Sequence, residues 1–165
     1  MDYSQEELQK MARHFADIYA AAEVEILGML AGEINEKIQD TNWAQSKLRQ
    51  IAQIQARIEK IVNPARHLSL QLLLESVSKV FVSGDGPAIS TNARALVLLL
   101  DELNDKVRKG WLRLITTSVA TYRTVIAQTF TLSVSGVLTR QQASRRILKQ
   151  LAARGLTVFR DVAVS

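Results

Sequence analysis

The chain has 165 residues and a formal net charge of +5, with 47% hydrophobic residues, 22% charged residues and no cysteine. This length and composition predict one folded domain of the all-α class, because few aromatic residues, glycines and prolines argue against a β-sandwich. The missing cysteines exclude disulfides and metal sites with thiolate ligands, and they fit a reducing compartment.

No segment of the sequence predicts export or a membrane span. Residues 1–7 are acidic and lack the basic and apolar regions of a secretory signal. The longest uncharged stretch, residues 124–139, is shorter than the roughly 20 residues that a spanning helix needs, and it contains several hydroxyl and amide side chains. We therefore expect no membrane association.

The first expected helix starts at a capping box formed by Ser4 and Glu7, in which each side chain bonds a backbone N–H of the first turn. Apolar residues then recur in steps of three and four: Leu8, Met11, Phe15, Ile18, Ala22, Ile26, Leu30, Ile34 and Ile38. A helix of this span approaches about 50 Å, so the molecule should be elongated. Gly28 and Gly32 lie one turn apart on it, and a crossing helix is favoured over a dimer contact as their explanation.

Two shorter helices should follow. Asp40, Thr41 and Asn42 are N-cap candidates for a helix that returns antiparallel to the first and ends before Pro64. Pro64 suits the first turn of the next helix, which should be broadly apolar and buried. Its apolar residues are Leu68, Leu70, Leu73, Leu74, Val77, Val80 and Phe81. Residues 83–87 have the sequence Ser-Gly-Asp-Gly-Pro and predict a loop.

The second long helix is expected at residues 88–132, with Gly110 as a candidate kink. Its inner face should consist of Leu96, Leu100, Leu103, Val107, Trp111, Leu114, Ser118, Tyr122, Val125 and Thr129, which keep a helical period. Gly136 ends this helix, and Thr139 with Gln142 forms a second capping box before a short helix that Gly155 closes. Residues 156–159 predict an extended segment that pairs with another chain, packs as coil or leads into a longer protein.

These elements predict an elongated antiparallel helical bundle with two long helices, a short C-terminal helix and a terminal extended segment. The expected organisation is a single helical domain, 1–165, with the N-terminal part of a longer protein as the alternative. Residues 1–82 form its acidic half, 83–87 the loop and 88–165 its basic half. The exposed apolar stripes of two such long helices should be covered by other subunits, so we expect several copies in an assembly.

Charge is the most informative feature of the sequence. Residues 1–40 contain nine acidic and three basic residues, whereas residues 106–160 contain eleven basic residues and no acidic one. The candidate contacts for DNA or an acidic surface are Lys106, Arg108, Lys109, Arg113, Arg123, Arg140, Arg145, Arg146, Lys149 and Arg154, and Arg160 completes the eleven. Such a half attracts phosphate without regard to base sequence, or it docks on acidic protein, including the acidic half of another copy. No motif for base recognition is present.

No residue set predicts catalysis, a cofactor or a metal site. His14 and His67 lie on different expected helices without a carboxylate cluster around both. Asp101 and Asp105 share a helical face, but Glu102 is spaced to pair with Lys106, and Asp105 with Lys109, so a solvated ion-paired face is the preferred interpretation. The segment 84–86 lacks the lysine and hydroxyl of a phosphate-binding loop. We therefore expect a protein that is not an enzyme.

Several segments resemble the phage minor capsid protein 2 family. The resemblance depends on Leu-Ile-Thr-Thr at 114–117, Val-Ser-Gly at 134–136, Thr139, Ala143, Ile147 and Leu-Ala-Ala-Arg-Gly-Leu at 151–156. An acidic first helix and an isoleucine-rich helix carrying Trp43 extend it upstream. The resemblance implies a virion component at the portal vertex or inside the capsid, present in the host cytoplasm during assembly. Its implied partners are portal or capsid proteins, and it implies no catalytic residue.

Two other classes of protein share these sequence features. The helical delivery domain of a secreted toxin is also long, amphipathic and free of cysteine, and neighbouring genes would separate it from a capsid protein. A nucleic-acid-binding regulator is the second alternative, for which sequence-dependent DNA binding is required.

Overall fold

The computed structural model describes residues 3–83, 89–150 and 153, and these residues are almost wholly helical. Its helices are α1 (Tyr3–Asn35), α2 (Trp43–Arg49), α3 (Ile51–Ser83) and α4 (Ile89–Val134), followed by a short helix at 140–150. The expected all-α class and the expected long helices are confirmed. The expected loop at 83–87 beyond Ser83, the cap at Gly155 and the extended segment at 156–159 lie outside the described residues.

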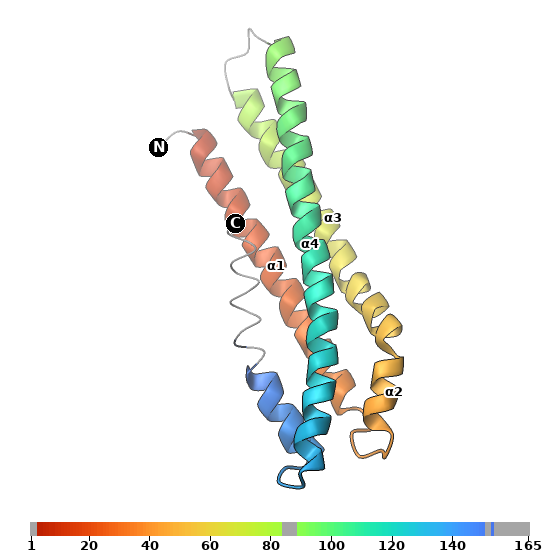
Figure 1. The fold of residues 1–165 in the computed structure, drawn as a ribbon. Coiled ribbons are helices and arrows are strands. Elements are labelled where there is room, and N and C mark those ends of the chain that lie inside the picture. Colours follow the sequence, from red (N-terminus) through yellow and green to blue (C-terminus); the bar gives the residue numbers. More distant parts are fainter. Residues whose placement is uncertain (1–2, 84–88, 151–152, 154–165) are drawn as a thin grey trace.

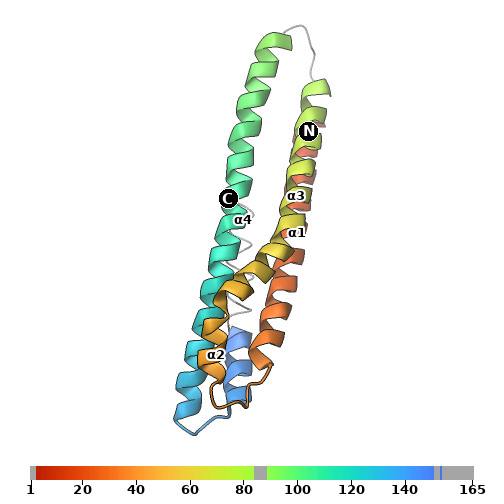
Figure 2. The ribbon, with the colours of Figure 1, turned by 90° about the vertical axis from the view of Figure 1, so that its right-hand side faces the viewer.

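The helices form an elongated antiparallel bundle (Figures 1 and 2). α1 and α4 run in the same direction, α2 and α3 run in the opposite one, and helix 140–150 turns back beside the lower end of α4. The α3–α4 hairpin extends beyond the start of α1. α3 therefore packs along both other long helices, while the outward faces of α1 and α4 point to solvent.

One main core holds the lower part of the bundle together. Its largest fully buried side chains are Ile26, Leu30, Ile34, Trp43, Ile54, Ile58, Val62, Trp111, Leu114, Tyr122 and Ile126. Tyr19 of α1 stacks on Trp111 of α4 with ring centroids 4.1 Å apart and an interplanar angle of 11°. A smaller cluster around Met11 and Leu73 lies nearer the start of α1. The predicted inner face of the second long helix is confirmed, because its residues from Leu100 to Thr129 are buried or half-buried.

α1 ends in a turn over residues 36–42. Lys37 there has a φ of 56°, a left-handed conformation that stops the helix and costs a residue with a Cβ roughly 1 kcal/mol or more. Trp43 holds the turn in place by donating its indole N–H to the carbonyl of Ile34 at 2.9 Å. Ile38 stays buried although it lies beyond the helix, so the expected apolar face is correct and the helix is slightly shorter than predicted.

The predicted helix break at Pro64 is wrong. α3 continues through Pro64, and the interruption lies instead at Gln50, between α2 and α3. A proline removes one hydrogen bond of the helix ladder and bends the helix, and α3 changes direction within its yellow part (Figure 2). The packing of buried residues on both sides, such as Val62 and Ser69, keeps the two segments in one helix.

The expectation that 64–82 is buried on most sides is also corrected. Leu73 is buried, but Leu68 and Leu74 are 52% and 55% exposed. Only one face of this segment meets α1 and α4, because α3 and α4 form a two-helix hairpin near its end. Its outer leucines are therefore open to solvent.

The glycine predictions have opposite outcomes. Gly136 follows the end of α4 with a φ of 78°, as predicted for a glycine that ends this helix. The predicted capping box is also present, because Thr139 and Gln142 form both of its hydrogen bonds at 3.1 Å. No described helix crosses at Gly28 or Gly32, because a Cβ added at either would meet no atom within 4 Å. Within the described residues, the crossing-helix explanation is therefore wrong. α4 is continuous through Gly110.

Candidate functional site

The predicted cations lie along α4 and on helix 140–150. α4 carries Lys106, Arg108, Lys109, Arg113 and Arg123, all exposed, and helix 140–150 carries Arg140, Arg145, Arg146 and Lys149. Arg154 and Arg160 lie outside the described residues. The structure therefore distributes the described cations over two neighbouring elements.

Two of these cations are already neutralised. Asp105 accepts a hydrogen bond from Arg108 at 2.8 Å and pairs with Lys109 at 2.9 Å. The bonds from Lys109 and Arg108 lower the pKa of the Asp105 carboxyl. The predicted Asp105–Lys109 pair is confirmed, whereas Glu102 and Lys106 form no ion pair. The two paired cations contribute less to the surface potential than the sequence suggests.

Arg140 has a structural role rather than a surface one. Its guanidinium donates hydrogen bonds to the carbonyls of Ile38 and Asp40, in the turn after α1. Nearby, the Ser144 hydroxyl donates to the amide oxygen of Asn35 at 3.3 Å. These bonds fix helix 140–150 against the lower end of α1, and they remove Arg140 from the cations available to a partner.

Six cations remain exposed and form no ion pair with any residue that the structure describes: Lys106, Arg113, Arg123, Arg145, Arg146 and Lys149. They are spread over a surface about 25 Å long on α4, from 106 to 123, and over helix 140–150 beside it. We call these six residues the cationic surface. The cationic surface is basic, as the sequence predicts, but it contains fewer residues than the set of candidate contacts in the sequence.

Apolar side chains lie between the cations, which sequence reasoning did not single out. Leu112, Phe130 and Val134 of α4 are 51%, 48% and 68% exposed. A surface that combines such groups with arginines is typical of protein interfaces. Their spacing in the sequence could have identified these residues, because it places them on the side of α4 opposite the predicted inner face.

In the acidic half, Glu33 forms an ion cluster with two cations, of which Lys47 is buried and Arg57 is half exposed. Glu33 of α1 binds Lys47 of α2 at 3.1 Å and Arg57 of α3 at 2.7 Å. Burial alone would raise the pKa of Glu33, but the hydrogen bonds from Lys47 and Arg57 outweigh it, and the pKa is lowered. Glu23 is also buried, so among the side chains that the structure describes from residue 6 to residue 40 the exposed acids are Glu6, Asp17, Glu25, Glu36 and Asp40. The opposite charges of the two halves thus persist at the surface.

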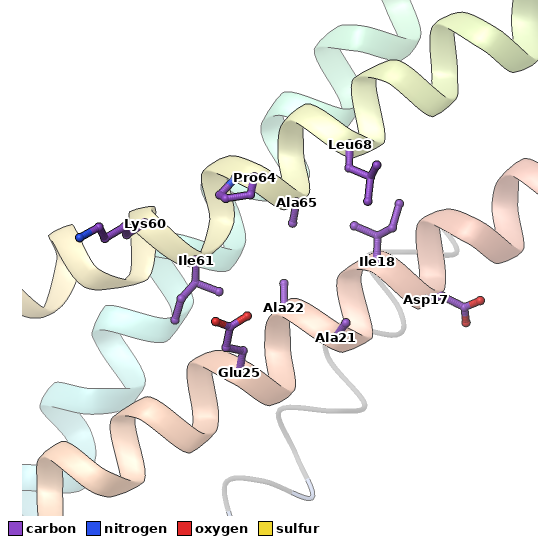
Figure 3. A pocket seen from close by; sticks show the side chains of 10 residues that line it. All are labelled: Asp17, Ile18, Ala21, Ala22, Glu25, Lys60, Ile61, Pro64, Ala65 and Leu68. Atoms are coloured by element: carbon purple, nitrogen blue, oxygen red, sulfur yellow. The ribbon is translucent and has the colours of Figure 1, made fainter.

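Two grooves flank α1. One, of about 580 Å³, lies towards α4; Phe15, Leu73 and Val107 contribute to its apolar floor, and Lys106 and Arg113 to its edge. The other, of about 570 Å³, lies between α1 and α3, where Ile18 and Ala22 point towards Ile61 and Ala65 (Figure 3). Neither groove brings together groups suited to acid–base or nucleophilic chemistry.

The structure tests the expected lack of a metal site and of a membrane-spanning helix only over the residues that it describes. His14 and His67 are exposed on α1 and α3. Within residues 3–83, 89–150 and 153, no group of three histidine, aspartate or glutamate side chains is arranged to hold a metal ion. No helix in the same ranges combines the length and hydropathy needed to cross a bilayer.

These features define a class: an elongated helical protein whose conspicuous surfaces are charged and apolar helix faces. Within that class, residues 4–164 match the phage minor capsid protein 2 family, so nearly the whole chain belongs to it. The resemblance found in the sequence is thereby confirmed, and the protein is a phage minor capsid protein. No curated protein and no solved structure matches the chain.

Proposed function

We propose that this protein is a structural, non-enzymatic component of a tailed bacteriophage head that binds the portal or the inner capsid during assembly. The observation that carries the proposal is the cationic surface, which adjoins exposed apolar residues on a rod-shaped minor capsid protein. The protein acts through complementarity of shape and charge with its partner, and it catalyses no reaction.

An acidic protein surface is the preferred partner of this region. Leu112 and Phe130 are half-exposed close in sequence to Arg113 and Arg123. Phosphate contacts use basic and polar groups, whereas desolvated aliphatic and aromatic side chains stabilise protein interfaces. Packaged DNA is the second contact, through Lys106 and the cations of helix 140–150, and it would be salt-dependent and indifferent to sequence.

The proposal is tested by mixing the purified protein with portal assemblies and with duplex DNA across a salt series. A triple variant, Lys106→Gln, Arg113→Gln and Arg123→Gln, should weaken binding. Where DNA is the partner, each lost phosphate contact should reduce the slope of log affinity against log salt by about 0.9.

The matched control removes three exposed cations from α1, α2 and α3, through Arg13→Gln, Arg49→Gln and Lys60→Gln. It changes net charge equally and should leave portal binding unchanged. Failure of the unmodified protein to bind either partner at low salt would overturn the proposal.

A further inference from the structure

The described helices cover the gap between α1 and α4 only at its lower end. There helix 140–150 lies beside α4 (Figure 1), with Ile147 in the main core and Arg140 bonded to the turn after α1. Further along the gap lies the groove of about 580 Å³ with its apolar floor. The described helices leave this floor accessible, so a further segment can bind there.

Helix 140–150 and the groove lie on the same face of α4. Gln128 borders a small cavity beside Ile147, and Gly110 borders the groove. These two residues of α4 are 18 positions apart, which is about five helical turns, so their side of the helix is the same. A chain that continues from helix 140–150 along this face of α4 therefore enters the groove.

The chain after Gln150 is directed towards the groove. Gln150 borders the same small cavity as Ala127, which sets its level along α4. Helix 140–150 runs opposite to α4 (Figure 1), and Ala153 is still helical. Each residue from Gln150 to Ala153 therefore lies closer to the level of the groove than the one before it.

The segment that follows Ala153 is long enough to reach the cations of the groove. Counted at about 1.5 Å per residue from the level of Ala127, Ala153 stands about 16 Å from the level of Arg113 and about 27 Å from that of Lys106. The chain from Ala153 to Asp161 spans about 12 Å as a helix and about 26 Å when extended. Asp161 therefore comes close to the level of one cation or the other in either conformation.

The composition of this segment fits the groove. Its apolar residues, which match the apolar floor, are Leu156, Val158, Phe159, Val162 and Val164. Asp161 is the one acid in the sequence from 151 to 165. The described residues that line the groove include Lys106 and Arg113 and no acid. An apolar segment with one acid is therefore complementary to an apolar groove with two cations at its edge.

The order of charges along the segment also corresponds to that along the gap. The buried Glu23 follows Tyr19, which borders the groove, by one turn of α1, so it faces the same gap on the side of helix 140–150. In the segment, Arg154 precedes Asp161. The chain that leaves helix 140–150 thus brings a cation towards the acid of the gap first, and an acid towards its cations afterwards.

We infer that residues 154–164 bind in the groove between α1 and α4, with Phe159 on the apolar floor and Asp161 on Lys106 and Arg113. The bound segment occupies two of the six residues of the cationic surface, so it competes with any partner of that surface for them. The contact within the chain stands by itself, whereas the competition rests on the proposed function.

Cross-linking in the full chain tests this contact, because the natural sequence contains no cysteine. Ala12 borders the groove and is exposed. A variant with Ala12→Cys and Val158→Cys, treated with a short bis-maleimide at low protein concentration, should give a link within one chain. The control, Leu68→Cys with Val158→Cys, uses an exposed residue of the groove between α1 and α3 and should give little. Equal yields, or links only between chains, would overturn the inference.

The accessibility of the groove is a second test. In the Ala12→Cys variant, Phe159→Asp should speed maleimide labelling of the cysteine by about tenfold, because the contact loses one buried phenylalanine side chain. The control, Val137→Asp, adds the same charge at a position that is 82% exposed and should leave the labelling rate unchanged. Labelling that is equally fast with and without Phe159→Asp contradicts the inference.

Exchange of charges separates this contact from the proposed function. In the cross-linking variant, Asp161→Lys should lower the yield, and the further changes Lys106→Asp and Arg113→Asp should restore it. A yield that does not respond to Asp161→Lys argues against the pairing. An intact cross-link without portal binding would refute the proposed function alone, and portal binding without a cross-link would refute this inference alone.

Discussion

The ring of Tyr19 lies flat against the indole of Trp111, with centroids 4.1 Å apart, and this contact joins the first and last long helices. Both side chains are buried, and burial raises the pKa of the Tyr19 hydroxyl to about 12. Because the stack fixes the relative height of α1 and α4, it determines which parts of their outward faces lie level with each other.

Truncating this stack should destabilise the whole bundle. Trp111→Ala removes a fully buried indole and leaves a cavity, so the free energy of unfolding should fall by about 3–5 kcal/mol. Urea denaturation followed by circular dichroism measures the loss. Arg113→Ala, an exposed neighbour, should change stability by less than about 0.5 kcal/mol. Equal effects of the two substitutions would contradict the packing described.

Removing the hydroxyl of Tyr122 should leave the protein as stable or make it more stable. This side chain is fully buried, and its hydroxyl has no hydrogen-bond partner among the described residues. Burial and the nearby Glu33 charge raise its pKa. Tyr122→Phe removes a buried polar atom without changing the ring, so stability should rise by up to about 1 kcal/mol. A loss of that size in thermal unfolding would show that the hydroxyl is bonded.

Glu33 should make stability depend on pH in the acidic range. Lys47 and Arg57 lower its folded-state pKa below the ordinary value of 4.5, so the unfolded chain takes up the proton first. The stabilisation is therefore complete above about pH 5 and is lost as pH falls through the lowered pKa. Urea titrations between neutral pH and about pH 3 should show this decline.

Substitution of Glu33 should flatten that decline and reduce stability at neutral pH. Glu33→Gln leaves the buried Lys47 ammonium without its carboxylate, a change worth about 3 kcal/mol. Glu36→Gln, an exposed neighbour, is the matched control and should retain the acid-dependent decline. An unchanged pH profile in the Glu33 variant would show that another group causes the dependence.

Arg140 should hold helix 140–150 against the bundle. Arg140→Met removes both hydrogen bonds to the turn after α1, and bonds of this charged type contribute about 2 kcal/mol each. Amide hydrogen exchange in 140–150 should accelerate while α4 remains protected. Arg145→Met, on an exposed position of the same helix, should leave exchange unchanged. Equal acceleration in both variants would argue against this anchor.

The sequence predicts the parts of this fold that depend on local spacing. Trp111, Tyr122 and Thr129 occur at helical intervals, so the inner face of α4 was predictable from periodicity alone. The Thr139–Gln142 capping box was predictable for the same reason, because its hydrogen bonds are local. The behaviour of Pro64 was not, since packing on both sides overrides its local preference.

Contacts between distant residues decide the rest of the site. Arg140 meets carbonyls about a hundred residues earlier, so its charge could not be distinguished from that of Arg145 in the sequence. Lys47 lies one turn after the buried Trp43, and this spacing was the one available sign that its side chain points inwards. The exposed Leu112 and Phe130 were missed because an aliphatic or aromatic residue is expected in a core.

The location of this protein in the virion is the central claim, and cryo-electron microscopy of the native particle tests it most directly. We predict elongated helical density from several copies at the portal vertex or on the inner capsid wall, with α4 and helix 140–150 facing an acidic protein surface or the packaged DNA. Particles that contain the protein only outside the capsid, or that lack it altogether, would contradict the claim.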